Sequence, residues 1–229
     1  MILISIVMMV LSSQAAQPSP DELQSWLTYY YIKPRPELLL PSLAVMDREL
    51  QRAKRRSLSD QVGRGGMRTF YAKVLAQNDK IVEDVERQLP ALPPGQQEFI
   101  TEALRRCGTK ACLRVLKSDV PLPSGLDRIT TPNDLDDRWG AFFATGDAKY
   151  VREVIEILDL AEDKADPTVL VVGGAARWSL TSNAYQHKRV LAICEEGARA
   201  SSGTRKRILD EIVSRAKVER VKKPPAEPE

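Results

Sequence analysis

The single histidine of the chain, His187, limits the acid–base and metal chemistry that the side chains can perform. One histidine cannot build a multi-histidine metal site, and as a catalytic base it would need a serine or cysteine nucleophile and an orienting carboxylate. The sequence contains no nucleophile motif of the form Gly-x-Ser-x-Gly. His187 falls in a predicted turn over 181–187, so we interpret it as a residue that caps a helix or faces water. With Asn183 and Tyr185 of the same turn it forms the set of candidate binding residues, and we predict no catalytic residues.

The three cysteines permit at most one internal disulfide. Cys107 and Cys112 are five residues apart across a predicted helix–turn–helix, where a turn at Gly108 could bring their Cα atoms within disulfide range. The alternative is two buried thiols, since both also lie on apolar helix faces. A Cys-x4-Cys pair without further ligands is a poor zinc site, so we predict no metal centre. Cys194 lies in an apolar run and is predicted to be a core thiol.

Charge and motifs exclude several other classes of function. The formal net charge is +3, from 34 basic and 31 acidic residues, which is too mild for a dedicated nucleic-acid binder. The sequence has no P-loop, no dinucleotide fingerprint and no calcium loop, so we predict no cofactor. The acidic residues Asp134, Asp136 and Asp137 open a predicted helix, and we interpret them as helix N-terminal charges on a solvated face.

Residues 1–16 have the composition of a signal peptide. The segment 1–11 carries no charged side chain and is almost wholly apolar, but it is shorter than the roughly twenty residues that a membrane span needs. Small residues at Ser13 and Ala15 predict cleavage after Ala15, or else after Ala16. No Lys or Arg precedes the apolar run, which leaves an uncleaved anchor or a late start as alternatives. The sequence therefore predicts an exported protein, periplasmic or secreted, without an integral membrane span once the signal is removed.

Trp139 and Trp178 begin two copies of one pattern, 39 residues apart. In both copies a polar turn follows the Trp, and a new apolar run begins twelve residues after it. The same offset follows Trp26 and Phe70. Because large aromatic residues recur at these equivalent points, we predict that they pack between neighbouring helices rather than at a recognition surface.

The elements that must position these residues are predicted to be helices. Apolar residues recur at helical spacing, and Ser19-Pro20-Asp21-Glu22 and Thr131-Pro132-Asn133-Asp134 are typical helix starts. The stretch 168–172 has a strand-like composition, but the helical pattern on both sides favours a helix whose two glycines allow close packing. We predict an all-α, solenoid-like stack of antiparallel helix pairs with about ten to eleven helices. It would form a single domain over 17–221, with a possible seam at 118–131 and a disordered tail over 222–229.

The segments Phe142–Asp147 and Ala176–Asn183 resemble those of small exported bacterial proteins of uncharacterised function, over roughly 136–197. This resemblance implies a bacterial exported location and transfers no catalytic residues. The leading hypothesis is a non-enzymatic protein- or peptide-binding module of the bacterial envelope, because helical stacks present extended surfaces. The alternatives are an envelope enzyme with a site near His187, and a binder of anionic surfaces through the basic C-terminal helix over 204–221.

Overall fold

The computed structural model describes residues 17–52, 65–118, 120, 126, 128–163 and 165–228. In these ranges the chain forms eleven α-helices, three short 3₁₀ helices and no strand, which confirms the predicted all-α fold and its number of helices. The predicted signal peptide, with its cleavage sites after Ala15 or Ala16, lies outside the described residues. None of the described helices has the length and apolar character that crossing a membrane requires.

The first half of the described chain is built from short helices with local start and stop signals. At Ser19 a capping box forms, in which the hydroxyl accepts from Glu22 N and the Glu22 carboxylate accepts from Ser19 N. Gly108 adopts a left-handed φ of 67° between the fifth and sixth helices. The elements are α1 (Pro20–Tyr29), η1 (Pro36–Leu38), α2 (Leu39–Arg52), α3 (Gly65–Ala76), α4 (Asp79–Gln88), η2 (Leu89–Ala91), α5 (Pro94–Cys107) and α6 (Lys110–Leu116).

The second half has longer helices. At the second predicted helix start the carboxylate of Asp134 accepts from Thr131 N at 2.7 Å, and Gly146 ends that helix at a φ of 67°. The stretch 168–172, which has a strand-like composition, is helical, as the helical pattern on both sides of it predicts. The elements are α7 (Pro132–Thr145), α8 (Ala148–Glu156), η3 (Leu158–Glu162), α9 (Pro167–Gln186), α10 (Lys188–Ala200) and α11 (Gly203–Lys222).

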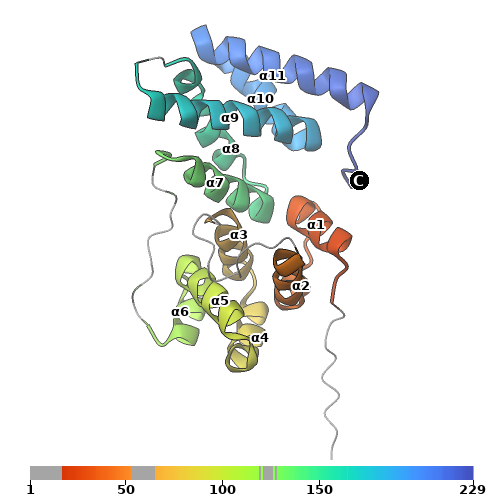
Figure 1. The fold of residues 1–229 in the computed structure, drawn as a ribbon, viewed down its shortest axis with the longest axis vertical. Helices are drawn as coiled ribbons and strands as arrows, with labels where there is room; N and C mark the ends of the chain where they lie inside the picture. Colours follow the sequence, from red (N-terminus) through yellow and green to blue (C-terminus); the bar gives the residue numbers. More distant parts are fainter. Residues whose placement is uncertain are drawn as a thin grey trace, which may run out of the picture.

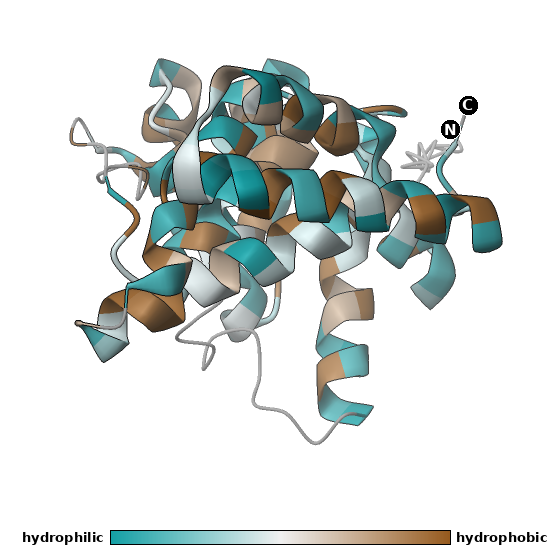
Figure 2. Cartoon of the chain, turned by 90° about the horizontal axis from the view of Figure 1, so that it is seen from above, coloured by the Kyte–Doolittle hydropathy of each residue, from teal (hydrophilic) through white to brown (hydrophobic). Residues whose placement is uncertain are grey.

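The helices stack along the long axis of the molecule, with α4, α5 and α6 at one end and α9, α10 and α11 at the other (Figure 1). Hydrophilic and hydrophobic residues alternate along the helices (Figure 2), as amphipathic packing requires. The buried residues form two clusters, one within 23–112 plus Ala144 and the other within 129–216. Phe143 packs against both clusters.

The crossing of α3 and α7 joins the two halves and is the most extensive helix–helix contact in the described chain. Glycines permit it, because a Cβ placed on Gly140 would lie 1.9 Å from the carbonyl oxygen of Gly66. A Cβ placed on Gly66 would lie 2.4 Å from the carbonyl oxygen of Asp136. The two helices therefore meet backbone against backbone, at a distance that no larger residue allows at these positions.

A buried carboxylate lies beside this crossing. The expectation that Asp137 is solvated is wrong: it is 7% exposed, and its Oδ1 accepts from Thr69 Oγ1 at 2.5 Å and lies 3.5 Å from Arg106 Nη1. Burial raises the pKa of Asp137, while Thr69 and Arg106 act in the opposite direction. The acidic run looked solvated because it opens a helix, but one face of that helix packs against α3.

Two of the three tryptophans are buried, and the third contradicts the packing prediction. Trp26 and Trp139 lie in the core, whereas Trp178 is 74% exposed. The reason is the register of α9, which buries Val172, Ala176, Leu180 and Ala184 at four-residue spacing. Trp178 follows Ala176 by two residues, about 200° around the helix, and so faces away from the core.

Gly173 and Gly174 are adjacent in α9, and we expect opposite results from replacing them. A Cβ on Gly173 would lie 2.1 Å from Ala161 N in η3, whereas a Cβ on Gly174 would meet nothing within 4 Å. Gly173→Ala is expected to lower the free energy of unfolding by about 1–3 kcal/mol, because the helix must move off a backbone. Gly174→Ala is expected to raise it by about 0.5–1 kcal/mol through helix propensity. Chemical denaturation measures both, and two changes of the same sign would contradict this packing.

Candidate functional site

The predicted turn over 181–187 is mostly the last part of α9, and the structure separates its three candidate residues. Asn183 is half-buried, and its Nδ2 donates to the carbonyl of Ser179 at 2.9 Å within the helix. Tyr185 lies at the surface groove described below. His187 lies between α9 and α10 and is fully buried. Only Tyr185 is therefore placed to contact a ligand in that groove.

His187 sits among aromatic rings, so the expectation that it faces water is wrong. Its ring centroid lies 5.3 Å from that of Tyr29 and 5.2 Å from that of Phe143, and its Nδ1 lies 3.1 Å from the hydroxyl of Tyr31. Burial, with a smaller effect from Arg220, lowers the pKa of His187 to about 4. Its Nε2 has no hydrogen-bond partner among the described residues. The ring is thus a neutral member of the core near pH 7, and the carboxylate that would orient a catalytic base is not bonded to it.

A groove of about 630 Å³ lies between α9 and α11. One wall is formed by Gly174, Trp178, Ser182 and Tyr185 of α9, whose spacing places them on a single helix face. The opposite wall includes Arg215 and Glu219 of α11, and Lys223 lies at the end of that helix. Trp178 is the large exposed aromatic residue of this surface.

The charges of α11 are mostly paired, which bears on its predicted role at anionic surfaces. Ion pairs in the described chain join six of its basic residues to carboxylates: Arg205, Lys206, Arg207, Lys217, Arg220 and Lys222. Within the same described residues Arg215 has no ion pair, and it faces the groove. Arg177, on the α9 side, pairs with Glu211 at 2.5 Å. The positive charge available to a ligand is therefore concentrated at the groove rather than spread along the helix.

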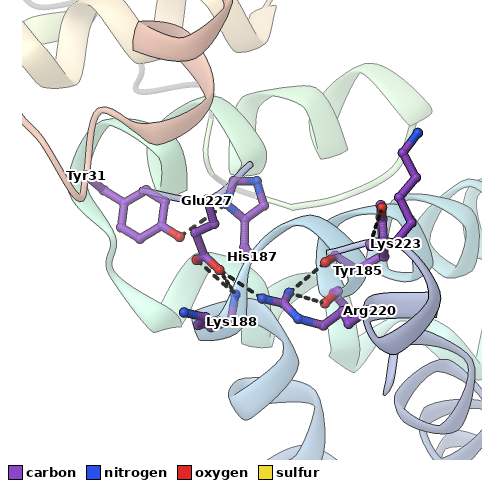
Figure 3. A network of polar contacts seen from close by, with 8 residues as sticks. Tyr31, Tyr185, His187, Lys188, Arg220, Lys223 and Glu227 are labelled. Carbon is purple, nitrogen blue, oxygen red and sulfur yellow. Dashed lines mark hydrogen bonds and ion pairs between the residues drawn. The ribbon is translucent and has the colours of Figure 1, made fainter. Parts of the chain in front are cut away.

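Residues 223–228, which fall in the stretch predicted to be a disordered tail, run back from the end of α11 toward the start of α10 (Figure 3). Tyr185 Oη donates to the carbonyl of Lys223 at 2.9 Å. Both carboxylate oxygens of Glu227 lie 3.0 Å from Lys188 N, the first amide of α10, and Arg220 Nη2 lies 2.9 Å from Glu227 Oε2. The side chain of Glu227 is 5% exposed. Contacts between charged groups, rather than burial of apolar side chains, hold this segment in place. Hydrophobic patterning of the sequence therefore could not predict its conformation.

The cysteines occupy two different environments. Cys107 and Cys112 form a disulfide in the structure, with Cα atoms 6.3 Å apart across the turn at Gly108. Cys194 is a buried free thiol, and burial raises its pKa to about 12, so it is unreactive near neutral pH. Over the residues that the structure describes, no cluster of three or more His, Cys, Asp or Glu side chains could hold a metal ion.

Comparisons of the chain with models of protein families, with curated proteins and with solved structures found no match. The groove is therefore interpreted from its own geometry. The sequence did contain the signal that would have found it: the four-residue spacing of 172, 176, 180 and 184 identifies the buried face of α9 and places Trp178 on the opposite one.

Proposed function

We propose that this chain is a non-enzymatic binding module that holds a peptide segment of another protein in the groove between α9 and α11. The observation that carries the proposal is the 74% exposure of Trp178 on the wall of that groove. Covering the exposed part of this indole would contribute on the order of 3 kcal/mol to binding. Tryptophan and arginine are the residue types that most often dominate the energy of protein interfaces.

Charge indicates the chemistry of the bound segment. Arg215 faces the groove without an ion pair in the described chain, and Lys223 adds a second cation at its end. A peptide that places an apolar or aromatic side chain on Trp178 and an acidic side chain near Arg215 would match both features. Because part of Arg215 stays in contact with water, we expect this charge to set specificity and association rate more than affinity.

The location remains part of the proposal. The signal-like segment 1–16 and the resemblance over roughly 136–197 favour a partner in the bacterial envelope or outside the cell. Fractionation of the tagged protein tests this independently of binding. Recovery in the cytoplasm alone would contradict export but would leave the proposed peptide binding in the groove unaffected.

Trp178→Ala is expected to weaken peptide binding by at least tenfold, because it removes the apolar anchor. Peptides selected from a displayed library on the intact protein serve as probes, and calorimetry measures their affinity. Val120→Ala is the control, since Val120 is also 74% exposed but does not line the groove. An equal loss in both variants, or no loss in Trp178→Ala, would contradict the proposal.

The variant Gly174→Ala provides a second and more specific test of the same proposal. The Cβ position of Gly174 is open, so Gly174→Ala leaves the fold intact and adds a methyl group to the wall beside Trp178. If this variant gains stability but binds the peptide more weakly, the loss of affinity arises in the groove and not from damage to the fold. Unchanged affinity in that variant would show that the ligand does not approach α9 at this point.

A further inference from the structure

The corner between α9 and α10 presents opposite charges to the two helix ends that meet there. Arg220 Nη1 donates to the carbonyl of Tyr185 at 2.6 Å, near the C-terminus of α9. The carboxylate of Glu227 accepts from Lys188 N at the N-terminus of α10. A cation at a helix C-terminus and an anion at a helix N-terminus both match the helix dipoles. The corner is thus built to hold a carboxylate, and Figure 3 shows one in place.

Residues 223–228, which supply this carboxylate, contact the rest of the chain in the way that a bound peptide would. Residues 223–228 form no helix or strand, and none of them belongs to either hydrophobic cluster. Glu227 is nevertheless almost enclosed, by Lys188 N and the Arg220 guanidinium, whose own side chain is 13% exposed. Prolines at 224, 225 and 228 restrict the segment to extended conformations, which lowers the entropy lost on docking.

The side chain of Tyr31 lies close to the bound carboxylate of Glu227 (Figure 3). Burial raises the pKa of Tyr31, and the negative charge of Glu227 is the next contribution in the same direction. The pKa of Tyr29 is raised by the same two causes in the same order. A carboxylate site flanked by tyrosines suits a short acidic segment with prolines on either side, since proline rings pack well on aromatic faces.

We propose that this corner, formed by Lys188 N, Arg220, Tyr29 and Tyr31, is a binding site for acidic, proline-flanked peptide segments, and that residues 223–228 occupy it in cis. A segment tethered by so short a linker has an effective concentration in the millimolar range. Suppose that a free peptide has the same intrinsic affinity for the corner as this segment, about 10 μM. It would then bind the intact chain roughly a hundredfold more weakly than it binds a chain whose own carboxylate has been removed. The corner adjoins the groove at Tyr185 and Lys223 but does not include Trp178, and the proposal stands without the proposed function.

The test uses the full chain and a fluorescent peptide with the sequence of residues 223–228, Lys-Pro-Pro-Ala-Glu-Pro. Fluorescence anisotropy is expected to show that Glu227→Ala binds this peptide at least tenfold more tightly than the unmodified chain. A control peptide with Gln in place of Glu is expected not to bind. Equal binding of both peptides, equal binding to both chains, or no binding to Glu227→Ala would overturn the proposal.

Two further variants locate the site. Adding Arg220→Lys to Glu227→Ala keeps the positive charge but removes the two-pronged guanidinium, so the peptide affinity is expected to fall by at least fivefold. Adding Trp178→Ala is expected to leave the peptide affinity unchanged. An unchanged affinity in the Arg220→Lys chain would overturn the assignment, and a loss in the Trp178→Ala chain would show that the peptide binds in the groove instead.

Discussion

Replacing Gly140 by alanine is expected to lower the free energy of unfolding by about 3 kcal/mol or more, the upper part of the range for overpacked cores. The added Cβ would lie 1.9 Å from the carbonyl oxygen and 2.7 Å from the carbonyl carbon of Gly66. Both atoms belong to the backbone of α3, so a side-chain rotation cannot relieve the contact. The helices would have to separate, which also weakens the contacts of Asp137 with Thr69 and Arg106.

Chemical denaturation followed by circular dichroism measures this loss. Gly174→Ala is the matched control, because it adds the same methyl group to a helix interior where nothing lies within 4 Å. Since the α3–α7 crossing joins the two hydrophobic clusters, Gly140→Ala is also expected to broaden the transition as the halves begin to unfold separately. A loss below about 1 kcal/mol, with a transition as sharp as that of the unmodified chain, would mean that the crossing is not this close.

Acidification is expected to destabilise the fold through His187. Its pKa falls from an ordinary value of 6.5 to about 4 in the folded chain, so between these values the unfolded chain binds more protons. The contribution of the neutral ring is fully present above pH 6.5 and is lost as the pH falls toward 4. Its size is about 3 kcal/mol, from about 1.36 kcal/mol for each pKa unit.

His187→Gln isolates this effect, because the amide does not titrate while the acidic side chains of the protein still do. The difference in unfolding free energy between the unmodified chain and the variant should shrink steadily from pH 6.5 to pH 4. Urea denaturation at several pH values gives both curves. Parallel curves would show that the ring is protonated in the folded chain or is open to water.

The helices could be predicted because their signals are local. Ser19 and Thr131 have their capping partners three residues away, and Gly108 and Gly146 supply the left-handed turns that end α5 and α7. Each of these signals depends on a few neighbouring residues and on nothing elsewhere in the chain. Helix starts, helix ends and the all-α class therefore follow from the sequence.

The environments of single residues depended on distant parts of the chain. His187 looked like a turn residue, but Tyr31, 156 residues earlier, lies beside its ring. Asp137 is predicted from its sequence neighbours to be solvated, but α3 covers it in the fold. Trp178 was matched to Trp139 by spacing, yet it is the twelfth residue of α9 whereas Trp139 is the eighth of α7. A repeat in spacing does not fix which face of a helix is buried when the two helices begin at different points.

The contrast among the three tryptophans gives the protein a built-in optical probe. Trp26 and Trp139 are shielded by the two cores, so a dissolved quencher of fluorescence will reach mainly Trp178. Iodide, an anion, will be attracted to the neighbouring Arg215, whereas caesium will be repelled. The quenchable fraction of the intrinsic emission therefore reports the α9–α11 surface alone, without a label or a substitution, while the unquenched fraction reports the interior.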